Sequence, residues 1–525
     1  HPSPPPPCGL TVHLPHRFTA SASPTTGTMK LKRRVESHNE ASRSSVHEAQ
    51  CTLPAMPRLL HPPISRALEA LDLVYFDNCF ASLSIIVGLN ARGLGSDAQL
   101  QAAWVQVVRM SPLLQMRVEG SGTGAVFRPL SSEQEWPTLK VAPRASDDEA
   151  LATARRLNEV EIQAISSGGL DAQRSSVRLN VVRGDRNLFF AICSPHHFCD
   201  GVAIGSIIIK LYFYALLPKL TWWLIDRMST AEIPTFWQMT LKSNHLLRTL
   251  DHGAMSQAVE ASIKYSPDNF RFAAYDIAAT NAAALKGLEA NVATVSREIL
   301  STVLPRLRAA GVTLTSAFGA LAIKLLAALL DRAGLNPDGK LLSTNAMDAR
   351  RLGKWDSASA GGTKTGNGGT RASKMPVVAN YTFACHTQVP FAAALQETVE
   401  AVAVRIKVDF DRVRDDATFR AHAVAAGAAQ PLPSSQPRVG CSSIVMPRIA
   451  NRAARAMIES RISFGPVPRV WFYVLTCGSQ TTINVDVALP LHICADDVRA
   501  SICECISGSV LEPFFAAVHA PVQHA

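Results

Sequence analysis

The segment "PHHFCDG" at 195–201 holds the residue types that could carry acid–base chemistry. His196 and His197 bear imidazoles, which titrate near neutral pH, and Asp200 places a carboxylate four residues after His196. One histidine could therefore act as a general base, with Asp200 either orienting it or holding the loop. A loop whose polar residues are merely hydrogen-bonded remains an alternative on spacing alone.

A metal site is the third interpretation of the same residues. It would use His196, His197 and Cys199, but adjacent histidines on a loop rarely reach one ion together. Phe198 indicates burial, and the sequence offers no second ligand cluster in a matching position. We therefore expect no metal.

The flanking residues predict how the motif is positioned. Residues 188–193 are continuously apolar, which is typical of a strand buried on both faces. Gly184, Asp185 and Arg186 separate this strand from an earlier β-type run, so the two should form a hairpin. Gly201 allows close approach of backbone or substrate, and it begins the return into a helix.

Other elements follow from periodicity, capping and turn residues. We expect helices at 97–108, from 147, at 313–334 and from about 391 and 495; strands at 340–351 and 375–389 and on both sides of Gly478; and a loop at 427–440.

The length of 525 residues calls for more than one lobe. We expect a disordered leader at 1–57, an N-terminal lobe at 58–220, a connector at 221–290 and a C-terminal lobe at 291–525. The stretch at 352–374 is Gly/Ser/Thr-rich and reads as a dispensable loop insertion. The leader lacks the apolar core of a signal peptide, while plastid or mitochondrial targeting stays open.

Composition narrows the class of protein. Apolar residues make up 47% and charged residues 18%, which is typical of a globular chain with helices packed on sheets. The net charge of +10 invites an anionic partner, but no basic block with interleaved aromatics points to nucleic acid. Eleven cysteines are scattered through apolar runs, which favours reduced thiols and a cytoplasmic protein.

One apolar stretch raises the question of a membrane. It spans 202–226 but is interrupted by Lys210, Pro218 and Lys219, so it lacks about 20 uninterrupted apolar residues for a spanning helix. A core helix followed by a surface segment is the better interpretation. A membrane-surface contact through Trp222 and Trp223 stays open.

The motif resembles the HHxxxDG motif of a large acyltransferase superfamily, which includes condensation domains, wax ester synthases, alcohol acetyltransferases and BAHD acyltransferases. With Asp200 and Gly201 fixed at its end, the catalytic histidine falls on His196 and the variable position on His197. Pro195 stands where the first histidine would be, a departure that BAHD members tolerate and that weakens a condensation-domain interpretation.

Further segments add to the resemblance. "LQAAWVQVVRMSPLLQMRV" is similar to the family's helix and "hPxLrxri", and "VTLTSAFGALAIKLL" to the helix that opens the second lobe. "STNAMDARR" resembles the "vNxRxR" or "vdlR" strand end, with Arg350 at the arginine. "ISFGPVPRVWF" faintly resembles "DFGWGxP", keeping Phe464, Gly465 and Pro468.

The resemblance implies an α/β (α+β) fold of two chloramphenicol-acetyltransferase-like lobes with mixed sheets and a tunnel between them. It implies that His196 takes the proton from a hydroxyl or amine acceptor as that group attacks an acyl thioester, without a covalent acyl-enzyme. It also implies that Asp200 turns away from substrate and pairs with Arg350. Ser442 and Ser443 are candidates, by position, for an oxyanion donor.

We therefore expect an acyl-CoA-dependent O-acyltransferase, of alcohol acetyltransferase or wax ester synthase type, that is monomeric, binds no cofactor and uses acyl-CoA as co-substrate. A carrier-protein-dependent or condensation-type enzyme is the nearest alternative. A non-catalytic relative that binds a partner is the alternative from another class.

Overall fold

The structure is a computed structural model, and it describes only part of the chain. The residues that it describes are 65–68, 76, 82–91, 94–167, 174–228, 291–295, 304–305, 307–335, 339–351, 378–416, 419–420, 437–445, 454–463, 468–477 and 480–507. The expected leader at 1–57, the insertion at 352–374 and most of the connector lie outside these residues.

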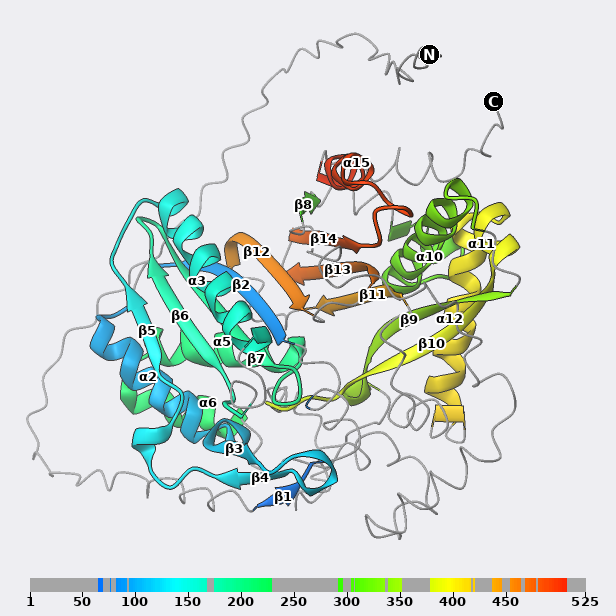
Figure 1. Ribbon diagram of the computed structural model, residues 1–525. Helices are drawn as coiled ribbons and strands as arrows, with labels where there is room; N and C mark the ends of the chain where they lie inside the picture. The colour runs from blue at the N-terminus through cyan, green and yellow to red at the C-terminus, as the bar shows by residue number, and fades with distance from the viewer. Residues whose placement is uncertain are drawn as a thin grey trace, which may run out of the picture. The chain divides into compact units, whose positions relative to one another are not determined.

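The N-terminal lobe is built on a mixed sheet of five strands in the order β12-β2-β7-β6-β5, shown in Figure 1. Its strands are β2 (Ser82–Asn90), β5 (Leu139–Ala142), β6 (Arg178–Arg183), β7 (Asn187–Pro195) and β12 (Ala454–Ser463). Strands β5 and β6 run parallel and the other pairs antiparallel. A smaller sheet, ordered β1-β4-β3, contains β1 (Arg66–Ala67), β3 (Met116–Glu119) and β4 (Val126–Pro129).

Helices cover both faces of the five-stranded sheet. They are α2 (Asp97–Arg109), α3 (Asp147–Ser167), α5 (Gly201–Leu216) and α6 (Trp222–Met228). The alternation of side chains along β7 divides its apolar run between the two faces. Phe190 and Ile192 enter the main core with α2 and α5, while Phe189 and Ala191 pack beside α3. The prediction of a strand buried on both faces is confirmed.

The C-terminal lobe is built on a second mixed sheet of six strands, ordered β10-β9-β11-β13-β14-β8. Its strands are β8 (Asn291–Val295), β9 (Lys340–Asp348), β10 (Thr382–Pro390), β11 (Arg438–Val445), β13 (Arg469–Cys477) and β14 (Gln480–Ala488). Its helices are α10 (Leu314–Arg332), α11 (Phe391–Gln396), α12 (Val399–Asp415) and α15 (Asp496–Ser507). Helix α10 is apolar enough to cross a membrane, but most of its residues are buried in this lobe's core.

The helix expected from about 391 is confirmed, since α11 begins at Phe391, but it ends at Gln396 and a second helix, α12, follows. The Lys324 ammonium, from α10, donates to the carbonyls of Ala394, Leu395 and Glu397 and so closes the end of α11. The Thr398 hydroxyl then caps the start of α12. Most of the loop expected at 427–440 lies outside the described residues, and its end is wrong, since strand β11 begins at Arg438.

The two lobes are not separate in sequence. Strand β12 comes late in the chain but pairs antiparallel with β2, at the edge of the N-terminal sheet. Ser463 lies opposite Ser82, which in turn lies opposite Pro195. The end of β12 is therefore level with the residue that precedes His196. The expected C-terminal lobe at 291–525 therefore includes a strand, β12, that belongs to the sheet of the N-terminal lobe.

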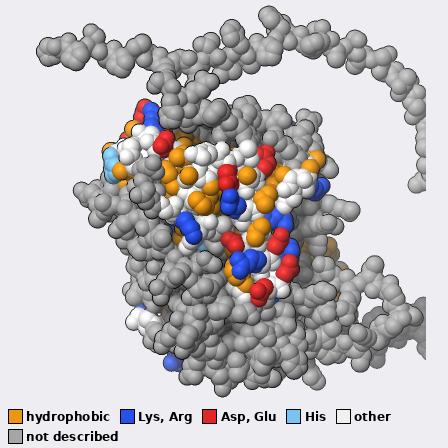
Figure 2. Space-filling view, turned by 90° about the vertical axis from the view of Figure 1, so that its right-hand side faces the viewer, with side chains coloured by type: hydrophobic (Ala, Val, Ile, Leu, Met, Phe, Trp, Pro, Cys, Tyr) orange, Lys and Arg blue, Asp and Glu red, His pale blue; other side chains and the backbone are white. Residues whose placement is uncertain are grey.

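Acidic and basic side chains are interspersed on the face that Figure 2 turns toward the viewer. Helix α12 carries several such pairs, including Arg405 with the preceding Glu397, Lys407 with Asp411, and Arg414 with Asp415. Exposed pairs of this kind contribute about 0–1 kcal/mol each. We infer that much of the charge on α12 is balanced locally.

Candidate active site

His196 directly follows β7, in a turn that leads into α5. The Phe198 amide donates to the Pro195 carbonyl over 3.1 Å and closes this turn. Asp200 then caps α5, because its Oδ1 accepts from the Ala203 amide over 2.8 Å. The sequence folds this way locally because an aspartate at the N-cap and a glycine behind it suit the start of a buried apolar helix.

His196 is 4% exposed. Burial lowers its pKa below the ordinary value near 6.5, while its own backbone and the Asp200 carboxylate act in the opposite direction. The imidazole is therefore neutral at neutral pH, the state that a general base requires.

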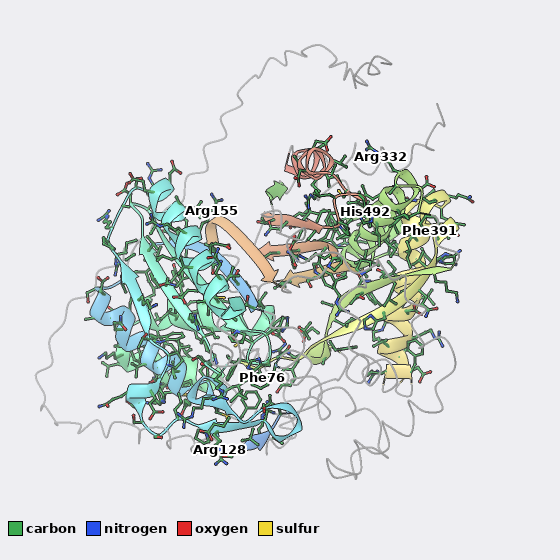
Figure 3. The ribbon with its side chains drawn as sticks, in the orientation of Figure 1. Phe76, Arg128, Arg155, Arg332, Phe391 and His492 are labelled. Atoms are coloured by element: carbon green, nitrogen blue, oxygen red, sulfur yellow. The ribbon has the colours of Figure 1, made fainter. Side chains whose placement is uncertain are left out.

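His197 is fully buried in an aromatic cluster. Its ring centroid lies 5.2 Å from that of Phe76, in an edge arrangement, and 4.7 Å from that of Phe198. Figure 3 labels Phe76, which lies close to the small sheet of the N-terminal lobe. These contacts make His197 a packing residue, at the position that the resemblance leaves variable.

Cys199 also lies within the motif, and it is a buried free thiol. Burial raises its pKa to about 12, so it stays protonated and is a poor nucleophile. The chemistry available at this turn is thus that of an imidazole.

The Asp200 carboxylate is fully buried and accepts three hydrogen bonds, none of them from His196. Its Oδ2 accepts from Arg350 NH1 over 2.7 Å and from the Tyr381 amide over 2.8 Å. Its Oδ1 is the acceptor that caps α5. The expected pair with Arg350 is present, and Asp200 ties the histidine turn to two segments of the other lobe.

Arg350 is held on several sides. Besides Asp200, it donates to Asp348 Oδ1 over 3.0 Å and to the Ala379 carbonyl over 2.8 Å. Its guanidinium carbon lies 4.7 Å from the centroid of the Tyr381 ring. Burial opposes its charge, but the two carboxylates outweigh this and hold the pKa of Arg350 above the ordinary value.

Asp348 supplies the second carboxylate of this cluster. Burial raises its pKa, Arg350 acts in the opposite direction, and the charge of Asp200 adds to the rise. Asp348 and Tyr381 were missed as functional residues. Asp348 lies inside "STNAMDARR", two residues before Arg350, whereas Tyr381 contributes its backbone amide to Asp200 and its ring to Arg350.

Gly201 is required by close packing against the other lobe. A Cβ placed on Gly201 would lie 2.2 Å from Cδ1 of Ile444, on β11. Because strand side chains alternate, Ser442 shares its face with Ile444, while Ser443 faces the opposite way with the core residue Cys441. The face toward the motif therefore carries Ser442 alone of the two oxyanion candidates.

The Ser442 hydroxyl is buried and accepts from Trp471 Nε1 over 3.2 Å. Its proton is therefore left to donate to another acceptor. The segment with Phe464 and Gly465 lies outside the described residues.

Neither a protein-family model nor a curated protein matches the sequence. Solved structures do. A trichothecene 15-O-acetyltransferase from Fusarium sporotrichioides matches with a TM-score of 0.57 and 14% identity, over 87% of this chain and 96% of that one. The first condensation domain of the calcium-dependent antibiotic synthetase matches with a TM-score of 0.53 and 13% identity, over 87% and 97%.

A polyketide synthase associated protein from Mycobacterium tuberculosis matches with a TM-score of 0.50 and 14% identity, over 84% of this chain and 98% of that one. At these identities the likeness establishes the fold. The chain has a two-lobed, chloramphenicol-acetyltransferase-like fold, with the mixed sheets that the family resemblance implied.

Proposed function

We propose that the chain is an acyltransferase that moves an acyl group from acyl-CoA to a hydroxyl or amine acceptor. The observation that carries the proposal is that Asp200 and His197 have structural roles in the motif. Asp200 is occupied by Arg350, Tyr381 and Ala203, and His197 by aromatic packing. His196 is left as the acid–base group, on a fold that an acetyltransferase shares.

The proposed reaction needs one base. The neutral His196 imidazole takes the proton of the acceptor hydroxyl or amine as that atom attacks the thioester carbonyl. The tetrahedral intermediate collapses, the carbon–sulfur bond breaks, and the imidazolium returns the proton to the leaving thiolate. Ser442 is the proposed donor to the oxyanion. We propose that donor and acceptor reach His196 through a tunnel between the lobes.

A second candidate differs in the donor. The likeness to a condensation domain favours a carrier-protein thioester as much as the likeness to an acetyltransferase favours acyl-CoA. Both donors present the same thioester to His196, so the reaction at the base is unchanged.

A donor-by-acceptor screen tests both candidates. The protein is incubated with acetyl-CoA, a long-chain acyl-CoA or an acyl-loaded carrier protein, each with pooled alcohols and amines. Free thiol and acylated products are followed, with His196→Gln as the control. Product from a CoA thioester that is lost in the control supports the first candidate, and product from the carrier alone supports the second. No product from any donor would favour a non-catalytic relative.

A further inference from the structure

A cavity of about 580 Å³ lies in the N-terminal lobe, and its lining includes no residue of the candidate active site. It is lined by the start of β6 and the residues before it, by β5, by Glu161 of α3, and by residues around β3 and the segment after β4. Its volume falls in the range of about 300–1,000 Å³ that is typical of small-molecule sites.

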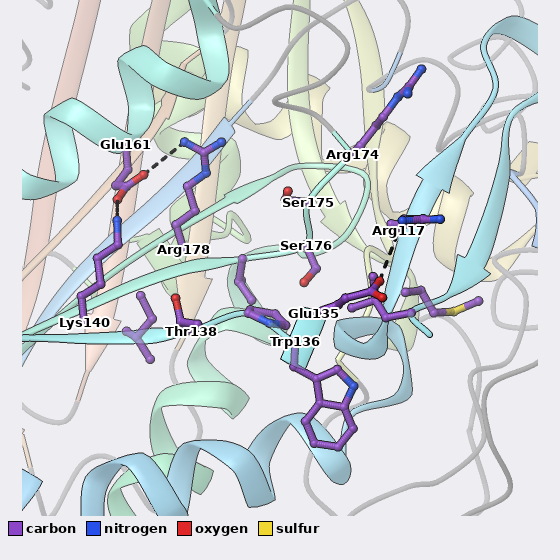
Figure 4. Close-up of a pocket in the computed structure, with 15 residues that line it drawn as sticks. Arg117, Glu135, Trp136, Thr138, Lys140, Glu161, Arg174, Ser175, Ser176 and Arg178 are labelled. Carbon is purple, nitrogen blue, oxygen red and sulfur yellow. Dashed lines mark hydrogen bonds and ion pairs between the residues drawn. The ribbon is translucent and has the colours of Figure 1, made fainter. Parts of the chain in front are cut away.

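Cationic residues line this cavity on two sides. Figure 4 shows Lys140 and Arg178 on one side, Arg117 and Arg174 on the other, and two serine residues between them. The lining holds four basic residues and two acidic ones, and Arg117 is paired with Glu135 at 3.8 Å and with Glu119 at 2.6 Å. The excess of basic charge therefore rests on Arg174 and on the pair of Lys140 and Arg178.

Glu161 is the better buried of the two acids, and its single negative charge does not balance the two positive charges of Lys140 and Arg178. Glu161 binds two cations at once, with Oε1 3.0 Å from Lys140 Nζ and Oε2 3.1 Å from Arg178 NH1. These bonds lower the pKa of Glu161 although burial raises it, so the carboxylate stays ionised. One positive charge is thus left over, beside an Arg178 side chain that is only 24% exposed.

The remaining lining is apolar or carries hydroxyls. Trp136, Leu130 and Met116 contribute apolar surface, and Ser175 and Thr138 contribute hydroxyl donors. A hydroxyl between cations suits an anionic oxygen, and an apolar wall suits a hydrocarbon or aromatic body.

We propose that this cavity binds an organic anion, with a carboxylate, sulfonate or phosphate head on an apolar body. The head lies between the two groups of cations, and the body lies against Trp136. The proposal does not depend on the transfer reaction proposed above.

The test is a fluorescence titration of the full chain with 1-anilinonaphthalene-8-sulfonate, and with N-phenyl-1-naphthylamine as its uncharged counterpart. Arg174→Gln and Lys140→Gln should each weaken binding of the sulfonate about tenfold, because each removes a charged partner. Both should leave the uncharged dye within about twofold of its wild-type affinity. Laurate should displace the sulfonate and dodecanol should not.

Three controls accompany the titration. Arg156→Gln removes an exposed charge from α3 outside the cavity lining and should change nothing. His196→Gln should bind the sulfonate like the wild type, which separates this site from the transfer reaction. Thermal unfolding shows that each variant is folded. Unchanged sulfonate affinity in both cavity variants, or equal affinity for the two dyes, would overturn the proposal.

Discussion

Arg350 and Asp200 form a buried ion pair between the two lobes, with NH1 2.7 Å from Oδ2. The pair fixes the end of the histidine turn to the end of β9. The arrangement differs from a catalytic triad, in which the carboxylate bonds the histidine. Asp200 is accordingly expected to act by positioning the turn and stabilising the fold.

Asp200→Asn and Arg350→Ala should each destabilise the protein by roughly 3–5 kcal/mol, because each leaves a buried charge without its main partner. The double variant should lose less than the sum of the two, since Asp200 and Arg350 are then both uncharged and only Asp348 loses its partner. Chemical denaturation measures the three free energies of unfolding. Additive losses would show that the two residues are not coupled.

His196→Gln should lower kcat by about 10²–10⁴-fold with little change in unfolding free energy, since general-base catalysis contributes about that much. His197→Leu is the matched control, because it keeps an apolar side chain in the aromatic cluster. It should retain most activity while changing stability. If the leucine variant were inactive and the glutamine variant active, the motif would have to be shifted by one residue.

The pH dependence of transfer should reflect the lowered pKa of His196. A base with a depressed pKa stays neutral to lower pH. The apparent pKa of the acid limb of kcat/KM should therefore be lower than 6.5. The profile is measured with saturating acceptor and varied donor. An acid limb clearly above pH 6.5 would contradict the burial of the imidazole.

His386, on β10, should make the fold sensitive to acid. Burial and the nearby Arg438 lower its pKa to about 3. A depressed pKa contributes stability that is present above about pH 6.5 and is lost as pH falls toward 3. His386→Gln should flatten the unfolding free energy between pH 7 and pH 4, and an unchanged slope would speak against this source of sensitivity.

Gly201→Ala should destabilise by about 1–3 kcal/mol, because its Cβ would overlap the end of Ile444. Ile444→Val in the same chain should recover part of the loss. Gly440→Ala should cost more, since its Cβ would lie 1.6 Å from the Thr344 carbonyl oxygen, which belongs to the backbone of β9. Thermal melting of the wild type and these three variants ranks their stabilities.

Local features of the fold were readable from the sequence because they depend on local physics. The hairpin before His196 follows from two β-type runs and the turn between them, and α10 begins at Leu314 because the Thr313 hydroxyl caps the helix. The end of α11 was not readable, because it depends on Lys324 from another helix. The role of Tyr381 was not readable either, because its amide and its ring contact Asp200 and Arg350 only in the folded protein.

The pairing of Asp200 with Arg350 was expected from a family resemblance, since nothing in the spacing of the two residues reveals it. The choice between Ser442 and Ser443 required knowing which face of β11 is turned toward the motif. The contact of Ile444 with Gly201 identifies that face. Adjacent candidates on a strand always face opposite ways.

The late strand β12 has a consequence for synthesis of the chain on the ribosome. Strand β2 is translated early, yet its partner on one side, β12, emerges only near the end. Until then β2 presents an unpaired edge, which is a template for pairing with another chain. The N-terminal lobe therefore cannot complete its sheet as an isolated fragment, and a nascent chain has to protect that edge until residues 454–463 have left the ribosome.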